Sequence, residues 1–101
     1  MPKRTRSYRS WLLGQLTDPR IAADYLNAAR GDSPKMFLVA LRNVAKAHQM
    51  AKVAKSAGVA RESLYNTLSR GGNPRLNTLD SVLKAMGLKI AVEPDLPEQP
   101  T

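Results

Sequence analysis

The chain has 101 residues, no cysteine and an apolar share of 43%. This length suits one folded domain, and the composition argues against wholesale disorder, disulfide bonds and thiolate metal sites. No apolar run approaches the roughly 18 residues of a transmembrane helix, and no secretory apolar region follows the basic N-terminus. We therefore expect a soluble, cytoplasmic protein that does not engage a membrane.

The net charge is +8, and it is unevenly distributed. Between residues 33 and 92 only Glu62 and Asp80 oppose ten basic side chains, which are Lys35, Arg42, Lys46, Lys52, Lys55, Arg61, Arg70, Arg75, Lys84 and Lys89. A domain this positive attracts polyanions, and DNA or RNA is the usual partner. The alternative is a solvated basic face that serves only solubility.

The first part of the chain predicts a basic segment followed by a helix. Residues 1–10 carry four basic groups and few apolar ones, which is typical of a flexible basic arm, and the apolar patch "SWLLGQL" at residues 10–16 follows it. Asp18 and Pro19 then suit the cap and first position of a helix, which Gly31 would end. Residues 1–16 are therefore expected to form an N-terminal arm.

The middle of the chain predicts three further helices. A long helix begins at Ser33-Pro34 and runs to about residue 48. Two short helices follow, at 51–57 and 61–69, and Gly58 turns the chain between them. The loop "RGGNPR" then breaks the helical pattern.

The C-terminal part predicts one more helix and a strand. Asn77 is the expected cap of the helix, and Gly87 is its expected stop. Residues 88–92 alternate between apolar and other side chains, which favours a short strand. A lone strand must pair with another copy or a partner, and the alternative is an extended tail packed on the helices. Residues 94–101 are expected to be a disordered tail.

These elements predict an all-α, five-helix repressor-like domain at residues 17–93, containing a helix-turn-helix and a short C-terminal strand. Two short helices joined by a tight glycine turn form that motif. Its core would be Ala54 at the helix crossing, Gly58 with positive φ, Val59 beneath the turn, and Leu64 and Leu68 against the domain. A generic helical hairpin would show part of the same pattern.

The second short helix would then present polar side chains. With its two leucines facing inward, the outward or flanking residues are Arg61, Glu62, Ser63, Tyr65 and Asn66. Such a helix fits the major groove, where Arg can contact guanine, Asn adenine and Glu cytosine. The alternatives are an ordinary solvent-facing surface, and a Glu62 that orients Arg61 without contacting a base.

Several sequence pieces carry a family resemblance. They are "AADYLNAA" at 22–29, Phe37-Leu38 with Val44-Ala45, Ala54 with Ala57-Gly58, "RESLYNTLS", "GNPRLNTL" and "LKAMGLKIAV". Over residues 18–94 the chain resembles the probable addiction-module antidote proteins, which are HigA-like antitoxins with a Cro/repressor-type helix-turn-helix. The resemblance implies an antitoxin of a type II toxin-antitoxin module. Such a protein binds its operator in double-stranded DNA as a homodimer, represses its own promoter and neutralises a RelE/ParE-like toxin.

The resemblance also implies roles for individual residues. The positions that match the base-reading side are Arg61, Glu62, Ser63 and Asn66. Lys52 matches a position that approaches phosphate, and Asn73 lies in a loop that is near the DNA backbone in relatives. Ala51 and Ala60 depart from the family, which often has a Ser or Thr cap at these positions.

Nothing in the sequence indicates catalysis, a metal or a cofactor. His48 is the only histidine, and without cysteine it cannot build a zinc site. The carboxylates lack a paired spacing for acid–base chemistry, and "GGNP" lacks the Lys and Ser/Thr of a phosphate-binding loop. We expect a protein that is not an enzyme. Besides the antitoxin, a free-standing phage-type repressor and a protein-binding adaptor remain as alternatives.

Overall fold

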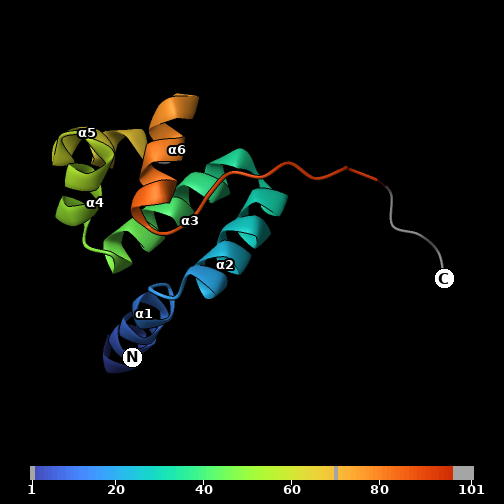
Figure 1. Ribbon diagram of the computed structural model, residues 1–101. Helices are drawn as coiled ribbons and strands as arrows, with labels where there is room; N and C mark the ends of the chain where they lie inside the picture. The colour runs from blue at the N-terminus through green and yellow to red at the C-terminus, as the bar shows by residue number, and fades with distance from the viewer. Residues whose placement is uncertain (1, 70, 97–101) are drawn as a thin grey trace.

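The computed structural model describes residues 2–69 and 71–96, and this part of the chain forms six helices and no strand (Figure 1). The helices are α1 (Pro2–Gln15), α2 (Pro19–Asp32), α3 (Pro34–Ala47), α4 (Met50–Ala57), α5 (Arg61–Thr67) and α6 (Leu76–Ala85). The predicted all-α class is confirmed, with one helix more than expected. Arg70 and most of the predicted disordered tail, 97–101, lie outside the described residues.

α2 and α3 each begin with a side chain that caps the first turn. The Asp18 side chain accepts a hydrogen bond from the Arg20 backbone N–H at 2.9 Å, and the Ser33 hydroxyl accepts one from the Met36 N–H at 3.0 Å. Both predicted helix starts are confirmed. The predicted stop at Gly31 is wrong, because α2 continues through that residue and ends where Ser33 adopts an extended backbone, with φ −173° and ψ 160°. Ser33 thus ends one helix and caps the next.

One apolar core holds the helices together. α2 packs along α3, while α4 packs against both α5 and α6. The largest fully buried side chains come from the helices or directly follow them, namely Leu16, Leu41, Val44, Val53, Leu64, Leu68 and Val82. Because α3 contacts α1, α2 and α4, it is the central element that joins the N-terminal helices to the α4–α6 group.

The N-terminal segment is helical, which corrects the flexible arm predicted for residues 1–10. Its end is fixed by Leu16, which is fully buried, and by Leu12, which packs against the core one turn earlier. The rings of Tyr8 and Trp11 lie 6.0 Å apart between centroids and are 62% and 58% exposed. α1 therefore carries an exposed aromatic pair. The division of the chain into arm, domain and tail stays a prediction.

The last helix begins earlier than predicted. The cap position is Arg75, which makes no side-chain capping bond, and Asn77 lies inside the first turn of α6. The helix stops as predicted at Gly87, whose φ of 77° is left-handed. Residues 88–96 contain neither helix nor strand, and they run first beside α2 and α3 and then beyond them. The predicted strand at 88–92 is therefore absent from the described chain. A strand requires a hydrogen-bonding neighbour, and this segment has none within the domain.

Candidate nucleic-acid interface

The turn between α4 and α5 depends on Gly58. This residue has φ 74° and ψ 29°, which confirms the predicted left-handed conformation. The Val59 N–H donates to the Ala54 carbonyl at 3.0 Å, and Ala54 is only 2% exposed, as its place at the helix contact requires. A Cβ at Gly58 would meet nothing within 4 Å, so the backbone conformation, not lack of space, calls for glycine here.

Two leucines fix α5 to the domain. Leu64 and Leu68 are each 1% exposed, and Val59 is half-buried against the same core. These side chains hold α5 against the domain, and their role as the core of a helix-turn-helix stays a prediction. α5 begins after Ala60, which makes no side-chain capping bond, as expected for alanine. The cap position of α4 is Gln49 and not Ala51, so the cap position inferred from the resemblance is wrong.

Four of the predicted base-reading residues share the outer side of α5. Arg61, Glu62, Ser63 and Asn66 are all exposed, while Leu64 and Leu68 are buried in the core. Within the described part of the chain, the side chains of Glu62, Ser63 and Asn66 form no hydrogen bond or ion pair. These polar groups are thus available to an external partner.

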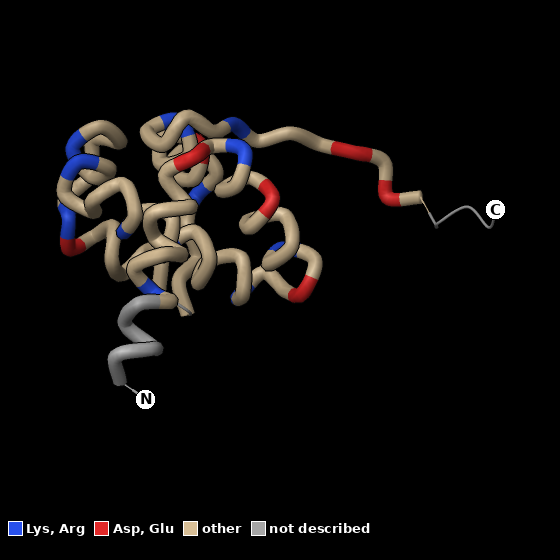
Figure 2. The backbone as a smooth tube through the Cα atoms, turned by 90° about the horizontal axis from the view of Figure 1, so that it is seen from below, with Lys and Arg blue, Asp and Glu red and all other residues tan. Residues whose placement is uncertain are grey.

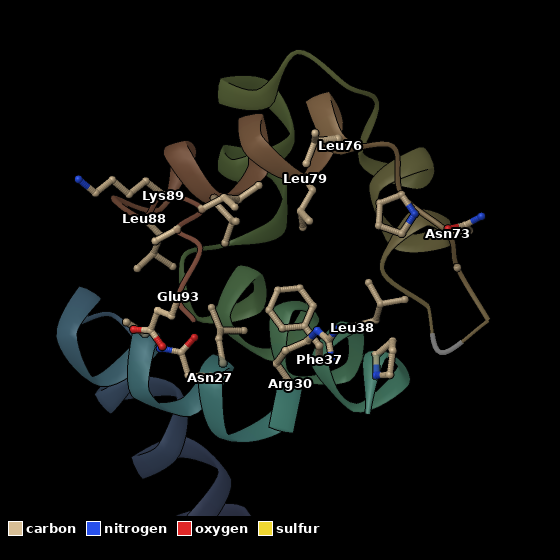
Figure 3. A pocket seen from close by; sticks show the side chains of 18 residues that line it. Asn27, Arg30, Phe37, Leu38, Asn73, Leu76, Leu79, Leu88, Lys89 and Glu93 are labelled. Carbon is tan, nitrogen blue, oxygen red and sulfur yellow. The ribbon is translucent and has the colours of Figure 1, made fainter. Parts of the chain in front are cut away.

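Two of the three remaining predicted contacts lie on neighbouring segments. Lys52 is exposed in the first turn of α4, and Asn73 is exposed in the loop between α5 and α6. Asn73 also lines one end of a groove on the domain surface, and its side chain points away from that groove in Figure 3.

Tyr65 differs from the other predicted contacts because it is half-buried. The guanidinium of Arg61 lies 5.5 Å from the centroid of its ring, and the guanidinium of Arg42 lies 5.3 Å from it. Both distances suit cation–π attraction. Tyr65 therefore packs against the arginine expected to read a base. Among the described residues, no ion pair joins Glu62 to Arg61 that would support the alternative that Glu62 orients Arg61.

Arg42 is the residue of this region that the sequence analysis did not single out. It lies on α3, and its Nε is buried without a hydrogen-bond partner in the described chain. Its contact with Tyr65 joins two helices that are separated in sequence by the whole of α4. No local pattern in the sequence signals such a tertiary contact.

Basic residues dominate the end of the molecule formed by α4 and α5. Figure 2 shows Lys and Arg positions at this end as well as across the rest of the molecule, whereas most Asp and Glu positions lie toward the other side and along the C-terminal segment. Within 50–67 the sequence has Lys52, Lys55 and Arg61 against Glu62 alone. The exposed face of α5 is thus set in a positive field.

A groove of about 580 Å³ lies between the α2–α3 pair and α6 with the segment that follows it (Figure 3). Its walls are mainly apolar and include Leu26, Phe37, Leu79 and Leu88. Charged groups from Arg30, Lys89 and Glu93 also line it. The residues after α6 therefore form one wall of a surface groove rather than part of the core.

The described residues contain no group of three or more His, Asp or Glu side chains that could hold a metal ion. Among those same residues, no helix combines the length and the apolar character that crossing a membrane demands.

The comparison with known families covers most of the chain. Residues 12–94 match a family model described as probable addiction module antidote protein. An uncharacterised protein of Haemophilus influenzae is 40% identical over 70 residues, which is 68% of this chain and 72% of that protein. No solved structure matches.

The chain is thus of the antidote class, which generally consists of regulators rather than enzymes. It belongs to the probable addiction module antidote protein family, because the matched region spans most of its length. Membership implies a cognate toxin as a partner.

Proposed function

We propose that this antidote protein is a sequence-specific DNA-binding antitoxin that represses its own promoter. In this proposal α4 and α5 act as a helix-turn-helix of the Cro/repressor type, and α5 enters the major groove. Arg61, Glu62, Ser63 and Asn66 read base edges, while Lys52 and Asn73 contact the DNA backbone. The protein acts as a dimer whose two α5 helices reach successive major grooves about 34 Å apart.

One observation carries the proposal. α5 is anchored by two buried leucines, yet its opposite side presents Arg61, Glu62, Ser63 and Asn66 to solvent within a region of net positive charge. A helix held rigidly on a core with exposed polar side chains near its N-terminus is the arrangement that major-groove reading requires. The basic surroundings would supply affinity through the phosphates.

The direct test is a mobility shift of the DNA upstream of the gene, measured at two salt concentrations. We expect affinity to fall steeply as salt rises, because each neutralised phosphate releases counterion. We also expect the upstream DNA to bind more tightly than a scrambled duplex of equal length. Equal binding of both duplexes would contradict sequence-specific repression. If neither duplex binds, the positive charge would instead favour a protein-binding adaptor.

For the toxin, we propose a small protein of the RelE/ParE type encoded beside this gene. The family membership supports a toxin partner, and the resemblance described above supports its type. Co-expression of the neighbouring gene product with this chain should yield a co-purifying complex and restore growth that the toxin alone arrests. A neighbouring product with neither effect would instead favour a free-standing repressor.

A further inference from the structure

The segment after α6 has an unsatisfied backbone. Leu88 N–H donates to the Leu83 carbonyl at 2.9 Å, and this is the last backbone hydrogen bond of the described chain. From residue 89 to residue 96 no backbone N–H or C=O is paired with another described backbone group. An extended run of unpaired groups is a template for pairing with another strand.

The side chains of the same segment leave an apolar face uncovered. Leu88 packs against the core, Ile90 is 40% exposed and Val92 is 94% exposed. In an extended chain these alternate residues share one face. The face therefore begins on the domain at Leu88, is partly covered at Ile90, and has almost no cover from the described residues at Val92. A partner that adds a strand beside it would also bury apolar surface.

The sequence of the segment is complementary to itself. In one antiparallel register, Ala91 of one copy lies opposite Ala91 of the other. Residue 90 then lies opposite residue 92 of the second copy, and residue 89 lies opposite residue 93. Ile90 then faces Val92 of the second copy, on the apolar side. Lys89 faces Glu93 of the second copy on the other side, and by symmetry each of these pairs occurs twice. Pro94, which lacks an N–H, would end the ladder.

We propose that residues 89–93 of two chains pair as an antiparallel ribbon centred on Ala91, and that this ribbon is the dimer contact. The occupant is a second copy of this chain because the charge pattern matches itself in one register. The inference deepens the proposed function by supplying its dimer. It is tested without DNA, so failure of the ribbon and failure of DNA recognition are separate results.

The first experiment reverses charges and measures the dimer dissociation constant by sedimentation equilibrium. Lys89→Glu alone would place like charges opposite each other twice, and so would Glu93→Lys alone. Each single change should weaken the dimer about tenfold, and the double change should return it to within about threefold of wild type. Unchanged dimerisation in the single variants, or a double variant no tighter than the singles, would overturn the register.

The second experiment uses a cysteine at the proposed two-fold axis. The natural chain has no cysteine, so Ala91→Cys introduces one thiol per copy. In the proposed register the two thiols lie directly opposite each other, and mild oxidation should give a covalent dimer. Val92→Cys is the matched control, because its thiol would face Ile90 and cross-link far less. Equal cross-linking of both variants would overturn the proposal. It would also be overturned if the wild-type chain is monomeric and substitutions at 88–92 abolish binding of the toxin.

Discussion

At the scale of single residues, the groups proposed to read bases lie on α5, and a group proposed to contact phosphate lies on α4. Arg61 and Asn66 are exposed on the outer side of α5, whereas Lys52 is exposed on α4. Base contacts discriminate between sequences, but phosphate contacts strengthen binding to all of them. The two kinds of residue should therefore give different mutational signatures.

Arg61→Ala and Asn66→Ala should each reduce the discrimination between the operator and a mismatched site by ~1–3 kcal/mol. Lys52→Ala should weaken both sites about equally and make the salt dependence shallower. The measurement is a titration of two duplexes at several salt concentrations. Lys35→Ala is the control, since it removes the same charge at the far end of α3 and should change little. Identical effects from all these variants would contradict the assigned roles.

Tyr65 makes a second prediction at this scale. Its ring lies within cation–π distance of Arg61 and Arg42, so removing the ring should loosen the proposed base reader. Tyr65→Leu should cost ~0.5–1 kcal/mol in operator binding, the usual value of an exposed cation–π contact. Tyr65→Phe keeps the ring and should bind like wild type. A Phe variant as weak as the Leu variant would indicate that the hydroxyl, and not the ring, is the important group.

At the scale of elements, the α4–α5 unit depends on its turn. Gly58 holds φ 74° in open surroundings, so a side chain there is penalised through the backbone alone. Gly31 is also in open surroundings but lies within α2, where alanine is favoured. The same substitution should therefore have opposite effects at the two sites.

Urea unfolding followed by circular dichroism should show this contrast. Gly58→Ala should lower the free energy of unfolding by ~1 kcal/mol, because a left-handed residue with a Cβ is strained. Gly31→Ala should raise it by about 0.5 kcal/mol, because it replaces a helical glycine near a helix end. A loss of stability in both variants would indicate a packing constraint that the open surroundings do not explain.

The sequence predicted these elements best where the signal is local. Capping groups at Asp18 and Ser33, and a left-handed turn at Gly58, are set by residues close to them in the chain, and all three were predicted. α1 was missed because its basic charge was taken as a sign of flexibility, although Leu12 and Leu16 fix its end to the core. The outward set on α5 followed from its buried leucines.

Features that depend on distant contacts were not accessible in this way. The approach of Arg42 to Tyr65 depends on how α3 and α5 pack, and no short pattern encodes it. The extended segment at 88–92 was predicted as a strand from its alternation, yet alternation gives only the capacity to pair. Whether a strand forms depends on a neighbour outside the chain.

At the scale of the whole molecule, the proposed dimer predicts how DNA affinity depends on the spacing between the two half-sites. Two α5 helices related by a two-fold axis can engage two half-sites only at one spacing and on one side of the duplex. Inserting about 5 base pairs between the half-sites rotates one of them by half a turn. Binding should then fall to the affinity of a single half-site.

This result can be checked by titrating duplexes with the natural spacer, the lengthened spacer and one half-site destroyed. The lengthened duplex should match the half-site duplex. If it binds as tightly as the natural duplex, the two recognition surfaces are either independent or flexibly linked. The ribbon centred on Ala91 would then not be the contact that sets the spacing.

The aromatic pair on α1 has a practical consequence. Trp11 is the one tryptophan of the chain, it is 58% exposed, and it lies well away in sequence from α4 and α5. Its emission is therefore a built-in optical reporter for the N-terminal helix. A macromolecule that covers α1 should shift the emission to shorter wavelength, whereas one that docks without touching this helix should leave the spectrum unaltered.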